Sequence, residues 1–150
     1  MWVDDKLEFA DATSVGTPNN STANLGDYMR LSDVRDIGNG EPVYLVVQVT
    51  AAITSGGSAK VAFMLVSDAT SSIATDGTAT KHVESDDIAV ASLVAGYQFV
   101  MPLPPRQPDW EEYVGLQIKE TASQALTAGN VNAFLTTQPA VYKAYADAAN

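Results

Sequence analysis

The stretch that decides the fold class is Pro42-Val43-Tyr44-Leu45-Val46-Val47-Gln48-Val49-Thr50, in which apolar residues recur with a period of two. In an extended chain, one face of this stretch would carry Val43, Leu45, Val47 and Val49. The stretch is rich in β-branched residues, and its proline stands at the edge, where a strand tolerates one. The pattern therefore predicts a β-strand with one face in an apolar core.

More strands are predicted on both sides of this stretch. Residues 60–66, KVAFMLV, follow a Ser-Gly-Gly-Ser turn at residues 55–58, and the two segments are predicted to pair as a long hairpin. Short runs bounded by turn residues predict further strands at residues 28–31, 80–83, 88–93, 97–103, 113–119 and 130–136. No segment through about residue 137 has sustained helical periodicity with caps. These signals favour an all-β sandwich or barrel.

Two segments are predicted to lie outside this β-core. Residues 11–24, DATSVGTPNNSTAN, have the composition of a loop or extended arm. Residues 139–147, PAVYKAYAD, are near the length at which an isolated helix is marginal in water, so they form either a frayed tail or a segment ordered by a partner. The prediction is therefore one domain over residues 1–150, with an N-terminal arm and loop at 1–27, a β-sandwich at 28–137 and a C-terminal tail at 138–150.

Composition and charge exclude several classes of partner. The chain has 150 residues, 46% of them hydrophobic, which is enough to bury a core in one domain. Its 18 acidic and 8 dispersed basic residues give a net charge of -10, which argues against nucleic acid and anionic membranes. There is no cysteine, so thiolate chemistry is excluded. The N-terminal residues lack a signal-peptide pattern, and we expect a protein made in the cytoplasm and kept there or released by lysis.

The residues that could perform chemistry form no catalytic pattern. The only histidine, His82, is predicted to be a half-exposed strand residue, and no Gly-x-Ser-x-Gly elbow accompanies it. Adjacent acids, as in Asp86-Asp87, point to opposite faces of a strand and do not converge. Asp76-Gly77 only faintly resembles a calcium loop. We therefore predict no enzymatic activity, no cofactor and no required metal.

Several phrases along the chain resemble the cement, or decoration, proteins on the capsids of Bordetella-type tailed phages. Residues 35–49, RDIGNGEPVYLVVQV, resemble that family's RDIGxGEPLYVVVQV, and residues 93–105, LVAGYQFVMPLPP, resemble its LxAGxQFxLPLPP. Residues 5–12, 112–116 and 126–135 also resemble the family, in the same order. The chain departs from the pattern at residues 68–87, at residues 106–111 and after residue 138.

The resemblance implies a jelly-roll-like antiparallel β-sandwich on the outer surface of an icosahedral capsid. There it would bridge subunits of the major capsid protein and associate with itself as a homodimer or homotrimer. The protein would act by adhesion and would be part of the virion. An alternative is a carbohydrate- or receptor-binding sandwich module, which would need exposed coplanar aromatic rings in a groove, whereas a cement protein needs an apolar face matched to its partner.

Large apolar residues near both ends of the chain are the candidate contacts with other proteins. Either both termini fold back onto the sandwich, or at least one terminus docks on an adjacent subunit through aromatic anchors. The predicted interface residues are Trp2, Leu7, Phe9, Trp110, Val141, Tyr142 and Tyr145.

Overall fold

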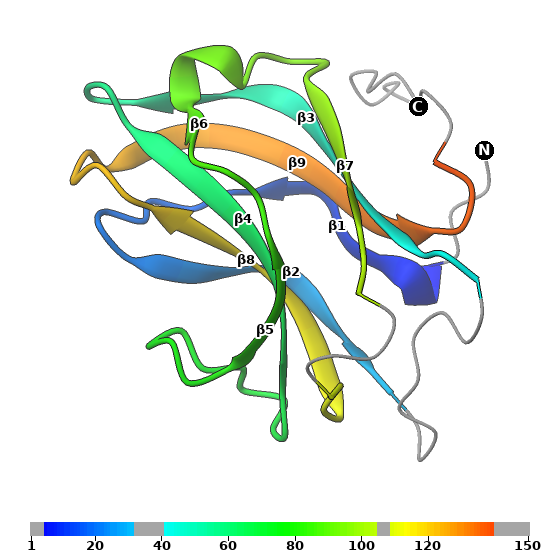
Figure 1. The fold of residues 1–150 in the computed structure, drawn as a ribbon. Helices are drawn as coiled ribbons and strands as arrows, with labels where there is room; N and C mark the ends of the chain where they lie inside the picture. Colours follow the sequence, from blue (N-terminus) through cyan, green and yellow to red (C-terminus); the bar gives the residue numbers. More distant parts are fainter. Residues whose placement is uncertain (1–4, 32–40, 105–108, 140–150) are drawn as a thin grey trace.

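The computed structural model describes residues 5–31, 41–104 and 109–139 of the chain (Figure 1). These residues form strands, joined by turns and by two short 3-10 helices. In chain order the elements are η1 (Asp5–Leu7), β1 (Glu8–Ser14), β2 (Thr22–Arg30), β3 (Tyr44–Ser55), β4 (Lys60–Asp68), β5 (Thr80–Glu84), β6 (Ile88–Ala89), η2 (Val90–Ser92), β7 (Gln98–Pro102), β8 (Tyr113–Glu120) and β9 (Leu126–Thr136). No helix among them is both long and apolar enough to cross a membrane.

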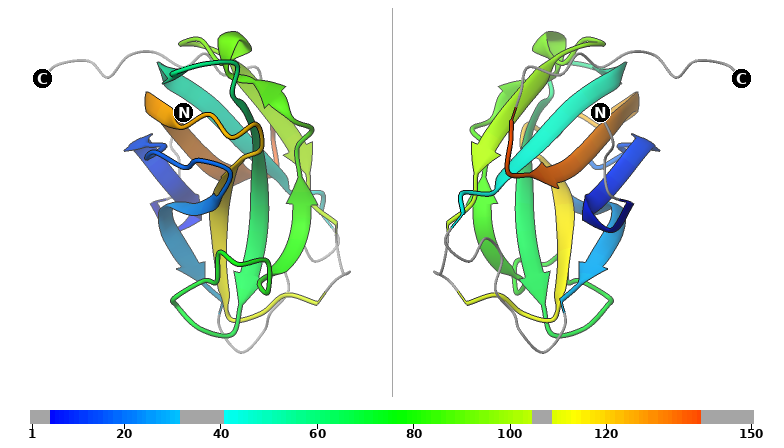
Figure 2. Two further views of the ribbon diagram at one scale, coloured as in Figure 1. Left: turned by 90° about the vertical axis from the view of Figure 1, so that its left-hand side faces the viewer. Right: turned by 90° about the vertical axis from the view of Figure 1, so that its right-hand side faces the viewer.

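The strands form two antiparallel sheets that pack as a β-sandwich (Figures 1 and 2). One sheet, here called sheet A, has the order β1-β9-β3-β7. The other, sheet B, has the order β2-β8-β4-β5, with β6 also paired to β4. The prediction of an all-β antiparallel sandwich is confirmed.

The core lies between the two sheets and is built by the period-two pattern. Leu45, Val47 and Val49 of β3 are fully buried, and they meet Phe63, Leu65 and Leu116 from sheet B. Leu135 of β9 belongs to the same cluster, while Val43 packs against it only partly buried. Fully burying side chains of this size stabilises the fold by roughly 1.5–3 kcal/mol each.

The predicted hairpin between β3 and β4 is wrong. β3 pairs with β9 and β7 in sheet A, whereas β4 pairs with β8, β5 and β6 in sheet B. The Ser-Gly-Gly-Ser turn therefore carries the chain from one sheet to the other. Periodicity identified both strands correctly. It could not show their pairing, because two strands have the same alternation of apolar residues whether they are neighbours in one sheet or lie in two facing sheets.

The prediction of an N-terminal arm and loop over residues 1–27 is also wrong for its described part. Residues 8–14 form β1 beside β9, and residues 22–30 form β2 beside β8. The sandwich therefore begins at β1, not at residue 28. Residues 15–21 remain a connection between these strands, with Val15 buried in the core. The predicted strand at residues 88–93 is instead the two-residue β6 followed by η2.

The connection between β4 and β5 covers part of the outer face of sheet B. Ile73 is buried there against Met64 and Val66, in a small cluster separate from the main core. Asn24 Nδ2 donates a hydrogen bond of 2.9 Å to the Ile73 carbonyl oxygen, and Gln117 Nε2 donates one of 2.9 Å to that of Ala74. Part of this face of the sandwich is therefore occupied by the chain itself.

Candidate functional site

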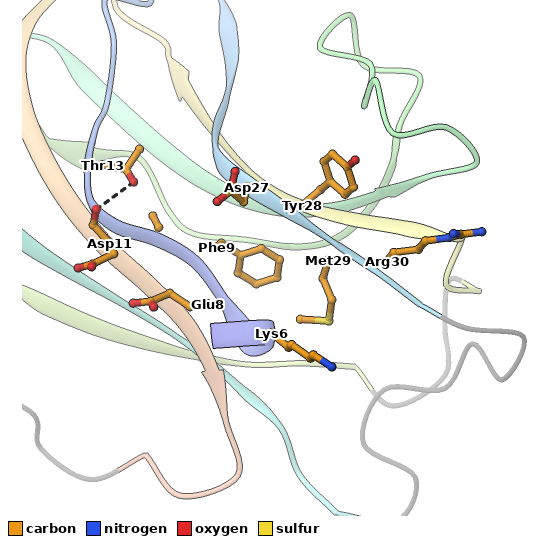
Figure 3. Close-up of a pocket in the computed structure, with 10 residues that line it drawn as sticks. Lys6, Glu8, Phe9, Asp11, Thr13, Asp27, Tyr28, Met29 and Arg30 are labelled. Atoms are coloured by element: carbon orange, nitrogen blue, oxygen red, sulfur yellow. Dashed lines mark hydrogen bonds between the residues drawn. The ribbon is translucent and has the colours of Figure 1, made fainter. Parts of the chain in front are cut away.

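A groove of about 650 Å³ lies along β1 and β2, the edge strands of sheets A and B (Figure 3). Each strand is hydrogen-bonded on one side only within its sheet, β1 to β9 and β2 to β8. Figure 3 shows the two strands diverging, β1 toward η1 and β2 toward Arg30. The groove opens where they separate, and its lining includes Lys6, Glu8, Phe9, Asp11, Asp27 and Met29.

A bulge in β2 shapes this groove. Leu25 lies opposite Leu116 and Tyr28 lies opposite Gly115, so Gly26 and Asp27 are two extra residues in β2. Gly26 has a φ of +73°, and a side chain there would overlap the Phe9 carbonyl oxygen of β1. The two strands thus touch at Gly26, and the bulge places the exposed Asp27 beside the groove.

The groove has a small apolar base between charged walls, in which acidic side chains outnumber basic ones. Phe9 is buried at its base, and Met29 packs partly buried against the same core. Asp11 of β1 and Asp27 of β2 are exposed, and their carboxylates make no ion pair with any residue that the structure describes. The groove therefore presents fixed negative charge from both strands beside apolar surface.

Arg30 adds little positive charge to this groove because its guanidinium is engaged elsewhere. Arg30 forms an ion pair of 2.7 Å with Glu112 and lies 5.8 Å from the centre of the Tyr113 ring. Tyr28 meets Tyr113 edge to face, with ring centres 5.4 Å apart and planes at 77°. These two rings are not coplanar, so they do not form the stacking platform that a glycan-binding module would need here.

His82 belongs to a buried polar cluster next to Trp110. Its ring stacks on the Trp110 indole, with centres 3.5 Å apart, and its Nε2 lies 2.7 Å from Ser67 Oγ. The Glu111 backbone N–H donates to the same Ser67 oxygen at 3.1 Å. His82 is only 9% exposed, so the prediction of a half-exposed strand residue is wrong. The cluster fixes the start of β8 against β4 and β5.

Comparison with known protein families identifies the family of this chain. The model of the Bbp16 family matches residues 9–135. The chain belongs to the Bbp16 family. This is a family of Bordetella phage proteins. No curated protein matches the chain. The Bbp16 match runs from β1 into β9, so it includes both strands of the groove.

In this Bbp16 protein, two of the predicted interface anchors are core residues. Phe9 is 1% exposed and Trp110 is 6% exposed, and both belong to the main hydrophobic cluster. Their prediction as contacts to another subunit is corrected, because neither side chain is accessible. Leu7 in η1 is 38% exposed and remains a candidate. The other predicted residues, Trp2, Val141, Tyr142 and Tyr145, lie outside the described residues.

Three acidic residues outside the groove, Asp76, Glu111 and Glu112, have partners within the fold. Glu111 accepts a hydrogen bond of 2.6 Å from the Thr80 hydroxyl, whereas its neighbour Glu112 binds Arg30. The Asp76 carboxylate accepts the hydroxyl and the N–H of Thr78, which lowers its pKa and closes a turn. Within the described ranges, no three acidic or histidine side chains gather in a way that could hold a metal ion.

Sequence reasoning missed one buried carboxylate, Glu120 at the end of β8. Glu120 is fully buried, and it accepts N–H groups from Asn20 and Ala122 at 2.7 Å each. It thereby links the β1–β2 connection to the β8–β9 turn. Burial opposes its ionisation, but the backbone N–H groups around it outweigh that effect and hold the pKa of Glu120 below its usual value. No sequence signal marks such a residue.

The buried position of His82 predicts a structural role. We expect His82→Ala to lower the free energy of unfolding by about 1–3 kcal/mol, because it removes the stack on Trp110 and a partner of Ser67. Urea unfolding measures the change. The control is Lys81→Ala on the same strand, which removes only a surface ion pair with Glu84 and should cost under about 1 kcal/mol. Equal effects of the two substitutions would contradict the structural role.

Proposed function

We propose that this protein is a structural component of a phage virion that binds the outer surface of an icosahedral capsid and bridges subunits of the major capsid protein. Membership of a phage protein family over residues 9–135 is the observation that carries this proposal. The phrases that resemble cement proteins support it, because the residues of these phrases that the structure describes lie on strands and connections of the sandwich. The crossing of successive strands β1 to β4 between the sheets fits a jelly-roll connectivity.

The mechanism in this proposal is adhesion without turnover. An interface of standard size, about 800 Å² on each partner, gives modest affinity for a single contact. A self-associated protein that contacts several shell subunits gains from the high effective concentration of the second contact. Because it binds the assembled lattice and not separate subunits, it stabilises that lattice by mass action. A rigid sandwich suits this role because little conformational freedom is lost on binding.

Binding to intact capsids is the direct test of this function. Purified protein mixed with capsids that lack it should co-sediment with them at high and saturable copy number. It should also raise the temperature at which the capsids disassemble, because it binds only the assembled state. Dissociated shell subunits serve as the control and should bind far more weakly. Protein that stays in the supernatant, together with unchanged capsid melting, would contradict the proposal.

A further inference from the structure

We propose that the β1–β2 groove binds an extended, basic segment of a capsid shell subunit. This inference rests on the proposed function, and it assigns the contact to one place on the sandwich. It follows from three features of the described residues: the open edges of two strands, an apolar floor between them, and two acidic side chains without partners.

The first feature is the position of the groove at the edges of both sheets. A strand at the edge of a sheet keeps backbone N–H and C=O groups that are free to pair with an added chain. Extended peptides commonly bind proteins by adding to such an edge. The two edges touch where Gly26 meets the Phe9 backbone. Figure 3 shows the two strands diverging toward η1 and toward Arg30, and the groove between them offers room for an added segment.

The second feature is the apolar surface inside the groove. Met29 lines it and is only partly buried, and Leu7 in the adjoining η1 is one of the more exposed large apolar side chains of the described chain, whereas Phe9 is buried beneath the groove and supports it from the core. An extended segment projects alternate side chains to opposite sides. One side chain in two would therefore meet this apolar floor, and those between would face the rim.

The third feature is the charge on the rim. Asp11 and Asp27 come from opposite strands, both are exposed, and neither is neutralised by a described residue. A lysine or arginine in the bound segment would pair with them, and the chain's net charge of -10 would steer a basic partner toward it. A second copy of this chain fits less well, because its basic residues are dispersed singly along the sequence.

Charge reversal in the groove tests this inference against capsids. The double variant Asp11→Lys with Asp27→Lys should bind capsids about tenfold more weakly or worse. The matched control is Asp86→Lys with Asp87→Lys, which changes the net charge equally at two exposed acids near β6 and should bind within about twofold of wild type. Copies bound per capsid are counted by co-sedimentation at low and at high salt, and wild-type affinity should fall as salt rises.

The outcomes separate the groove from the proposed function. If the wild-type protein binds capsids and the groove variant binds them equally well, the groove assignment is overturned and the proposed capsid binding stands. Failure of the wild-type protein to bind capsids would overturn both. A third outcome is that the groove variant is monomeric in sedimentation velocity, where the wild type self-associates, but the monomer still binds capsids. The groove would then contact a second copy of this chain, and its assignment to a shell segment would be overturned. Should the lysine variant not fold, Asp11→Asn with Asp27→Asn should still weaken binding several-fold.

Discussion

Replacing Gly26 with alanine should lower the free energy of unfolding by about 4 kcal/mol or more, enough to unfold a marginal domain. Gly26 combines a φ of +73° with close approach to β1, where an added Cβ would overlap the Phe9 carbonyl oxygen. That oxygen is backbone, so it cannot rotate away as a side chain would. β2 would have to move away from β1, and the core around Phe9 would open.

A second glycine provides a control for this result. Gly77 also has a positive φ, +94°, but an added Cβ there would meet nothing within 4 Å. Gly77→Ala therefore carries the backbone strain alone, which is about 1–3 kcal/mol. Urea unfolding of both variants separates the strain from the steric overlap. If the two substitutions cost the same, the contact between β1 and β2 at Gly26 does not limit stability.

The central strands were predictable because they are buried on a regular pattern. Leu45, Val47 and Val49 of β3 face the main core, as the period of two predicts, and four of the seven residues at 44–50 are β-branched. The predicted bounds of β4, β5, β7 and β8 also lie close to those observed. What periodicity did not reveal was pairing. Two strands joined by a short turn look alike whether they are neighbours in one sheet or lie in facing sheets.

β1 and all of β2 except its last residues, which the predicted strand at 28–31 covers, were missed for a physical reason. β1 and β2 bury few residues in the core, chiefly Phe9, Ala10 and Leu25, and most of their other positions are polar or small. Both strands contain register shifts, which break the period of two that identifies a strand. An isolated glycine inside such a stretch, here Gly26, is the one signal that would have indicated a bulge.

The candidate site was mispredicted because composition does not separate core aromatics from interface aromatics. Phe9 and Trp110 are large and apolar, and the fold buries both. The groove that the structure shows instead depends on Asp11 and Asp27, which come together only when β1 and β2 become neighbouring edges. That juxtaposition depends on tertiary structure, and no local pattern in residues 11–27 indicates it.

Replacing Glu120 with glutamine should lower the free energy of unfolding by about 2–4 kcal/mol at pH 7. The carboxylate accepts an N–H at each oxygen, from Asn20 at Oε2 and from Ala122 at Oε1. An amide offers one acceptor, so its NH₂ group would face a backbone N–H and leave that donor buried without a partner. The β1–β2 connection would lose its link to the β8–β9 turn.

The effect of pH distinguishes this role from simple packing. Burial alone would raise the pKa of Glu120, but hydrogen bonds from the backbone of Asn20, Ala122, Gln124 and Ser123 outweigh it and hold the pKa below about 4.5, its ordinary value. A group with a depressed pKa in the folded state contributes its full stability above the unfolded pKa. That contribution is then lost as the pH falls through the lower, folded value. Wild-type stability should therefore decline below about pH 4.5 more steeply than that of Glu120→Gln.

The measurement is urea unfolding of both proteins between pH 7 and pH 3, read as the difference in free energy of unfolding. The pKa of Asp68 is also lowered, chiefly by the Ala74 N–H, but both proteins share this group, so it cancels in the difference. Glu84→Gln is the control, because Glu84 pairs with Lys81 at the surface and should contribute no more than about 1 kcal/mol. The gap between wild type and Glu120→Gln should narrow in acid as Glu120 becomes protonated. A gap that stays constant across the range would mean that Glu120 stabilises the fold by its shape and not by its charge.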